Sequence, residues 1–122
     1  MENLSIEATS FGPAIELKSS GFIAIKGRSL LEDAHQYFEP VITWTSHYLS
    51  TNTGPLEIEI FLTYFNSSTA KQLLKLLMLV DEDEVDATVT WRYPNNNQLL
   101  KRRGEELAIM LDLPFSYQPQ NV

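Results

Sequence analysis

The sequence contains no cysteine, only five glycines and few basic residues. Without cysteine, the chain has no disulfide framework, thiolate metal site or cysteine nucleophile, and it is consistent with a reducing compartment. Nine Lys and Arg residues stand against 16 Asp and Glu residues, a formal net charge of -7. Binding to a phosphate backbone depends on cations that displace counterions, so we expect no nucleic-acid partner.

Long apolar runs are also missing. No segment approaches the roughly 20 apolar residues that a membrane span needs, and the first residues are acidic where a secretory signal would be basic. We therefore expect a cytoplasmic protein with no membrane insertion. At 122 residues and 43% hydrophobic residues, the chain is predicted to be a single domain over residues 1–122 that needs no metal or disulfide to hold its core.

The usual signs of catalysis are scarce. His35 and His47 lie on one predicted helix, where their spacing points them about 120° apart, too divergent to share a metal ion. The serines lie in no nucleophile-elbow sequence, and no glycine-rich phosphate loop is present. The visible carboxylate pairs, such as Glu57 with Glu59, fall on exposed faces. We expect no enzyme activity, no metal and no cofactor.

Hydrophobic patterning predicts alternating strands and helices. Strands are expected at 5–7, 14–17, 22–26, 56–65, 87–93 and 115–118, separated by Gly, Pro, Ser and Asn turns. The spacing of Ser29 and Glu32 resembles a capping box and predicts a helix start at Ser29. The apolar face of that helix runs from Ala34 to Leu49, and Pro40 is expected to kink it near Gln36 or split it.

Two further helices follow, the second at 67–80 and the third after the turn at 94–97. The strands before and after the second helix should be parallel, because a helix is the only connection between them. The fold class is therefore α/β, a mixed β-sheet of about five to six strands with about three helices. Residues 118–122 are expected to form a flexible tail.

The junction between the strand at 56–65 and the second helix is rich in hydroxyl groups, Asn66-Ser67-Ser68-Thr69. Its plain interpretation is an N-cap, because Asn, Ser and Thr side chains accept hydrogen bonds from the free N–H groups of a first helical turn. A hydroxyl there is also suited to a switch. A phosphate would gain the helix N-terminus and bring a charge of roughly -1.5 to -2.

Several segments resemble one family. The strand-to-helix segment IFLTYFNSSTAKQLLKLL, with FEPVITW, TWRYP and RRGEEL, is similar to the SiaC family of small acidic bacterial phosphoproteins, relatives of the STAS domains of anti-sigma factor antagonists. The most specific motif is aromatic-x-Asn-(Ser/Thr)-Ser-(Ser/Thr)-x-Lys, where x is any residue. It is matched here by Tyr64, Phe65, Asn66, Ser67, Ser68, Thr69, Ala70 and Lys71.

The resemblance implies a STAS-like fold and a phosphorylation cycle run by a Ser/Thr protein kinase and a PP2C-type phosphatase. The unphosphorylated form is expected to bind and activate a diguanylate cyclase, which raises cyclic di-GMP and promotes aggregation or biofilm growth. The modified hydroxyl carries over to Ser67, with Ser68 and Thr69 as alternates. The residues expected at the partner-binding surface are Asn66, Ser67, Ser68, Thr69 and Lys71.

Two alternatives stay open. The chain could be an anti-sigma factor antagonist in a sigma-factor partner-switching pathway, whose target would be an anti-sigma kinase. It could also be a small ligand-binding domain with Tyr64, Trp91 and Tyr93 lining a pocket. The sequence favours packing over binding for these three, because aromatic residues are common on sheet faces.

Overall fold

A computed structural model describes residues 1–52 and 54–121. These residues form six strands and three helices, ordered along the chain as β1 (Leu4–Ile6), β2 (Ala14–Lys18), β3 (Phe22–Ser29), α1 (Ala34–Thr51), β4 (Leu56–Phe65), α2 (Ser67–Glu82), β5 (Ala87–Pro94), α3 (Gln98–Ile109) and β6 (Phe115–Gln120). None of the helices in this part of the chain is long and apolar enough to cross a membrane.

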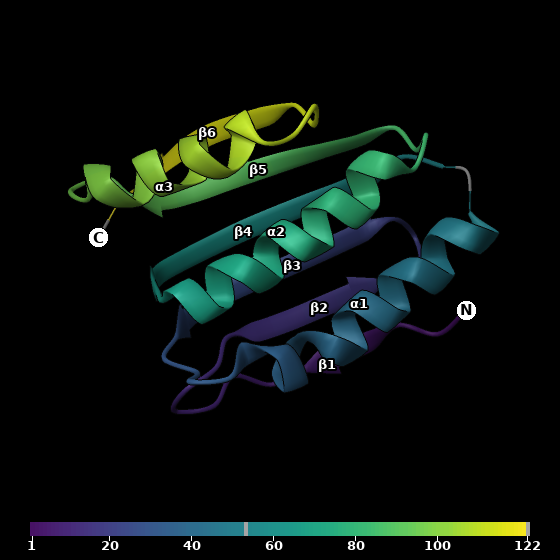
Figure 1. The fold of residues 1–122 in the computed structure, drawn as a ribbon, viewed down its shortest axis with the longest axis horizontal. Coiled ribbons are helices and arrows are strands. Elements are labelled where there is room, and N and C mark those ends of the chain that lie inside the picture. Colours follow the sequence, from purple (N-terminus) through teal and green to yellow (C-terminus); the bar gives the residue numbers. More distant parts are fainter. Residues whose placement is uncertain (53, 122) are drawn as a thin grey trace.

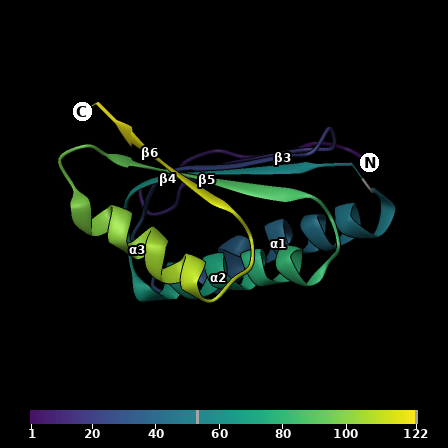
Figure 2. The ribbon, with the colours of Figure 1, turned by 90° about the horizontal axis from the view of Figure 1, so that it is seen from above.

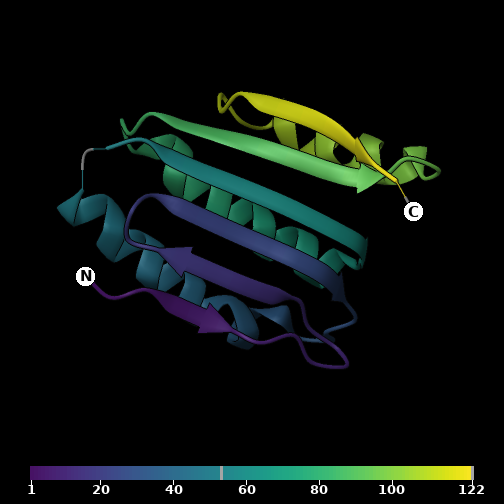
Figure 3. The same cartoon turned by 180° about the vertical axis from the view of Figure 1, so that it is seen from behind.

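The six strands form one mixed sheet whose order in space is the order in sequence (Figures 1 and 3). β1, β2 and β3 pair antiparallel, whereas β3, β4, β5 and β6 pair parallel. Each parallel pair is joined through a helix, as the chain requires for a parallel connection. The mixed α/β sheet predicted from the sequence is confirmed.

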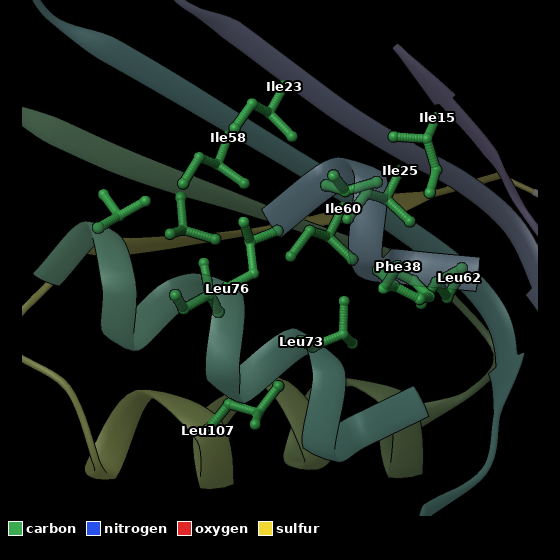
Figure 4. Close-up of a cluster of buried hydrophobic side chains, with 14 of the residues drawn as sticks. Ile15, Ile23, Ile25, Phe38, Ile58, Ile60, Leu62, Leu73, Leu76 and Leu107 are labelled. Atoms are coloured by element: carbon green, nitrogen blue, oxygen red, sulfur yellow. The ribbon is translucent and has the colours of Figure 1, made fainter. Parts of the chain in front are cut away.

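All three helices cover the same face of the sheet and leave the other face open (Figure 2). The alternating pattern of β4 explains this asymmetry. Leu56, Ile58 and Ile60 are buried beneath the helices, while Glu57 is exposed on the open face. The core lies between the two layers, where sheet residues such as Ile25 and Ile60 belong to the same buried cluster as Leu73 of α2 (Figure 4). Burial of these side chains is the main favourable term for the fold.

The predicted helix start at Ser29 is wrong. Ser29 is the last residue of β3, is fully buried and pairs with Phe65 of β4. The helix begins five residues later at Ala34, where the Asp33 carboxylate accepts a hydrogen bond from the His35 backbone N–H at 3.1 Å. Strand pairing and burial hold Ser29 in β3, and these tertiary contacts outweigh the local capping signal.

Of the two outcomes predicted for Pro40, the split is wrong, because α1 is continuous from Ala34 to Thr51 with the exposed Pro40 inside it. The kink near Gln36 stays a prediction. The predicted inward face of α1 is confirmed. Phe38, Val41 and Tyr48 are buried, and the flanking Ile42 packs against the core.

The flexible tail predicted at 118–122 begins too early. Gln118, Pro119 and Gln120 belong to β6, and the Asn95 backbone N–H donates to the Gln120 carbonyl at 2.8 Å. Pro119 is tolerated because β6 is an edge strand, where a missing N–H need not break a ladder. Val122 lies outside the described residues.

Candidate functional site

Asn66 connects the end of β4 to the first turn of α2. Its side-chain oxygen accepts from the Thr69 backbone N–H at 3.0 Å, and its amide nitrogen donates to the Leu31 carbonyl at 2.8 Å. The first contact is the N-cap expected from the sequence. The second ties the start of α2 to the β3–α1 loop, so both ends of the Asn66 amide are used inside the protein.

A β-bulge brings the end of β3 to the same place. The register between β3 and β4 shifts after Gly27, whose φ of +129° suits glycine. Ser29 therefore pairs with Phe65 at the end of β4. The Ser29 hydroxyl meets the Thr69 hydroxyl at 2.5 Å, and both residues are fully buried. These two hydroxyls satisfy each other in the interior.

The three hydroxyls after Asn66 differ in depth. Thr69 is buried against Ser29. Ser68 is half-buried, and its oxygen accepts from the Ala34 backbone N–H at 2.9 Å, which stabilises the start of α1. Ser67 is exposed, and its hydroxyl makes no hydrogen bond to any of the described residues. Of the three, Ser67 presents a hydroxyl group to solvent.

Ser67 begins a stripe on the outer side of α2. Lys71 and Leu74 follow it at four- and three-residue spacing, so the three side chains share one helix face. Lys71 and Leu74 also line a groove of about 200 Å³ between α2 and α3, together with Arg103 and Met110. The outer face of α2 is thus continuous with this α2–α3 groove.

A second groove borders the other side of the same stripe. It lies between α1 and α2, has a volume of about 430 Å³ and is lined by Ile42, Lys71, Leu74, Lys75, Met78, Leu79 and Glu82. Met78 is 42% exposed, and Met110 at the α2–α3 groove is 65% exposed. Exposed methionines beside apolar grooves are typical of protein-binding surfaces. We call Ser67, Lys71, Leu74 and the two flanking grooves the α2 surface.

Arg103 of α3 is a site residue that the sequence interpretation missed. One of its guanidinium nitrogens donates to the Phe65 carbonyl at 2.6 Å, and the guanidinium lies 4.0 Å from the centroid of the Phe65 ring. A signal was present in the sequence. Arg103 stands three residues after Leu100 and four before Leu107, so it interrupts an otherwise apolar helix face.

The three aromatic residues considered as a ligand pocket do not come together as one. Trp91 and Tyr93 are buried, whereas Tyr64 is 49% exposed. Trp91 donates from its ring nitrogen to the Leu100 carbonyl at 2.9 Å and packs against Gly104. The packing role favoured from the sequence is confirmed for Trp91 and Tyr93.

Comparison with known proteins gives one consistent result. The family model described as SiaC family regulatory phosphoprotein matches residues 6–120. An uncharacterised protein of Pseudomonas aeruginosa strain UCBPP-PA14 is 29% identical, and the match covers 97% of each chain. The crystal structure of apo-SiaC from P. aeruginosa superposes with a TM-score of 0.91 at 29% identity, over 97% of this chain and 99% of that one.

A further match is to one chain of a solved structure described as the diguanylate cyclase SiaD of P. aeruginosa in complex with its activator SiaC. The TM-score is 0.91 at 28% identity, and the match covers 96% of this chain and 99% of the matched chain. The family motif falls at the β4–α2 junction, and the structural match covers nearly the whole of both chains. The protein described here therefore belongs to the SiaC family of regulatory phosphoproteins.

Proposed function

We propose that this protein is a cytoplasmic, non-enzymatic regulator whose unphosphorylated form binds and activates a diguanylate cyclase, and that phosphorylation of Ser67 weakens this binding. The solved complex of the P. aeruginosa activator with its cyclase supports the choice of partner. We assign the phosphate to Ser67 because its side chain is exposed, whereas the hydroxyls of Ser68 and Thr69 make hydrogen bonds inside the protein.

The chemistry of the α2 surface suits this role. It combines the apolar Leu74 and Met78 with the cations Lys71 and Lys75 on a chain whose net charge is -7. A partner surface with apolar and acidic side chains would complement it. A phosphate on Ser67 would add roughly -1.5 to -2 of charge one helical turn from Lys71. That charge would neutralise the local cation and repel an acidic partner.

Asn66, Ser68 and Thr69 have a supporting part in this proposal. Their polar groups cap α2 and join it to β3 and to the start of α1. They hold Ser67 in place, and Asn66 and Ser68 are each partly exposed next to it. Lys71 is exposed and available for direct contact with the partner.

A dedicated Ser/Thr protein kinase and a PP2C-type phosphatase would set the phosphorylation state. Incubation with ATP and a Ser/Thr protein kinase that acts on the protein in a lysate of the native cell, followed by mass spectrometry, tests the site. We expect phosphate on Ser67, none on the Ser67→Ala variant, and full incorporation in the control Ser116→Ala, which removes an exposed hydroxyl from β6. Phosphate on Ser67→Ala in undiminished amount would contradict the assignment.

The partner is tested by pull-down from the native cell with the unphosphorylated protein as bait. The proposal expects a diguanylate cyclase, and it expects addition of the purified protein to raise the rate of cyclic di-GMP synthesis by that cyclase. Recovery of an anti-sigma kinase in its place, with no change in cyclase rate, would identify a sigma-factor pathway and overturn the proposal.

A further inference from the structure

Arg103 makes no ion pair with the described residues at the β4–α2 junction, although the Glu106 side chain lines the same groove. Within residues 1–52 and 54–121, the ion pair between Arg92 and Glu59 is found on the open face of the sheet, and no carboxylate lies within 4.0 Å of Arg103. The half-buried guanidinium is held by a carbonyl oxygen and an aromatic ring, both of Phe65. An arginine has five N–H donors in a planar fork, so this environment leaves most of its donors free.

The position of Arg103 relative to Ser67 follows from the chain. The carbonyl that Arg103 contacts belongs to Phe65, and two residues of chain span at most about 7 Å. Ser67 also shares its helix face with Lys71 and Leu74, and both of these line the α2–α3 groove together with Arg103. Helical side chains lean toward the N-terminus, which brings the Lys71 side chain over the turn that contains Ser67.

We propose that Arg103 binds the phosphate of phosphorylated Ser67 within the same chain, with Lys71 as a second cation. The inference rests on the proposed function, which places the phosphate on Ser67. Arginine suits this task because its fork matches two phosphate oxygens at once, whereas lysine acts as a point charge. The free N–H groups at the start of α2 add to the same positive environment.

This binding would change the positions of two side chains in the phosphorylated protein. Arg103 and Lys71 would turn toward the phosphate, at the end of the α2–α3 groove that also contains Leu74 and Met110. The two cations would then be used internally and no longer be offered to an acidic partner. Phosphorylation would thus act by removing cations from the α2 surface as well as by adding negative charge.

The test is a ³¹P NMR titration of the full chain with phosphoserine introduced at position 67 by genetic encoding, which needs no kinase. We expect the second pKa of the phosphate to lie about 1 unit lower in the otherwise native protein than in Arg103→Gln, because an adjacent cation favours the dianion. The matched control is Arg102→Gln, which removes the same charge from the exposed neighbouring residue and should leave the phosphate pKa unchanged.

A second measurement does not depend on a variant that might fold poorly. In the phosphorylated native protein, the Arg103 side-chain ¹H–¹⁵N resonance should shift with pH along the titration curve of the phosphate, and it should not do so in the unphosphorylated protein. Equal phosphate pKa values in the native protein and Arg103→Gln, or an Arg103 resonance that ignores the phosphate titration, would overturn the inference.

The two proposals fail separately. If the cyclase binds phosphorylated and unphosphorylated protein equally while the phosphate pKa still depends on Arg103, the proposed function is wrong and the inference stands. If phosphorylation weakens cyclase binding but the phosphate titrates independently of Arg103, the switch acts without this intramolecular contact.

Discussion

At the scale of single residues, three consecutive hydroxyls take three different roles. Thr69 pairs with Ser29 in the interior, Ser68 accepts from the Ala34 backbone, and Ser67 is exposed. Such a gradient follows from helix geometry, because successive residues point about 100° apart around the axis. One turn therefore presents an anchoring hydroxyl to the core and a modifiable one to solvent.

The buried pair predicts a clear energetic coupling. Thr69→Val leaves the Ser29 hydroxyl buried without a partner and should cost about 1–3 kcal/mol in the free energy of unfolding. Adding Ser29→Ala to that variant should cost less than the sum of the two single changes, because no orphaned hydroxyl remains. Urea denaturation of the four proteins measures this coupling.

Ser67→Ala is the control for this cycle and should change the free energy of unfolding by less than about 0.5 kcal/mol, as is usual at an exposed position. Strict additivity of Ser29→Ala and Thr69→Val would contradict the direct contact between the two hydroxyls.

The sequence identified this hydroxyl cluster and its capping role but not the depth of each residue. Capping depends on residues within one turn, so the pattern of Asn66 followed by Thr69 was sufficient to predict it. The Ser29–Thr69 contact and the Arg103–Phe65 contact join residues about 40 positions apart. Neither contact leaves a local pattern, because both depend on how β3 and α3 pack against the junction.

At the scale of elements, Asn66 determines how α2 begins. Asn66→Ala removes the cap on Thr69 and the hydrogen bond to Leu31, and it should lower the free energy of unfolding by about 1–2 kcal/mol. Asn66→Asp keeps an acceptor for the cap but loses the donor to Leu31, so its loss should be smaller. Chemical denaturation of both variants tests this order.

Asn96→Ala, at an exposed residue of the β5–α3 turn, is the matched control for these variants and should be nearly neutral. If Asn66→Asp were as destabilised as Asn66→Ala, the cap would not be the source of the stability.

The packing of α3 on the sheet depends on a glycine. A Cβ at Gly104 would lie 2.6 Å from atoms of the buried Trp91 ring, too close for a normal contact. Gly104→Ala should therefore destabilise the protein by about 1–3 kcal/mol through overpacking, although alanine is the better helix former by about 1 kcal/mol. Thermal unfolding followed by tryptophan fluorescence measures the change.

The control for the glycine is Arg102→Ala, an exposed change in the same helix that should leave the melting temperature nearly unaltered. A Gly104→Ala protein more stable than the native one would show that α3 can move away from Trp91 without cost. In the sequence, Gly104 stands four residues after Leu100 and three before Leu107, which is the spacing of one helix face, but no local pattern indicates that it faces Trp91.

Two of the errors in predicting element bounds have the same cause. Ser29 carries a local helix-start signal, and Pro119 and Gln120 belong to a polar segment near the end of the chain, yet all three residues lie in strands. Pairing with a neighbouring strand decided their structure. Hydrophobic periodicity predicted the existence and type of each helix and strand well, because it reports which side chains are buried. It placed the ends of these elements less well, because an end depends on contacts with other elements of the fold.

At the scale of the whole molecule, one layer of helices on one face of the sheet brings together Ser67, Lys71 and the two grooves of the α2 surface. α2 lies between α1 and α3 (Figures 1 and 2), so its outer face borders a groove on each side. Five of the nine basic residues lie on α2 and α3. The hydrophobic pattern predicted the mixed sheet, but it did not predict that α2 and α3 would lie side by side and bring these cations together.

The proposed switch requires that the cyclase bind the two phosphorylation states of the protein with different affinity. The dissociation constant for the diguanylate cyclase recovered by the pull-down should be measured for the unphosphorylated protein and for the protein carrying phosphate on Ser67. We predict that phosphorylation weakens binding at least about tenfold, equivalent to about 1.4 kcal/mol. The Ser67→Ala variant, even after treatment with the kinase, should bind the cyclase as tightly as the unphosphorylated native protein does. Equal dissociation constants for the two phosphorylation states would contradict the account.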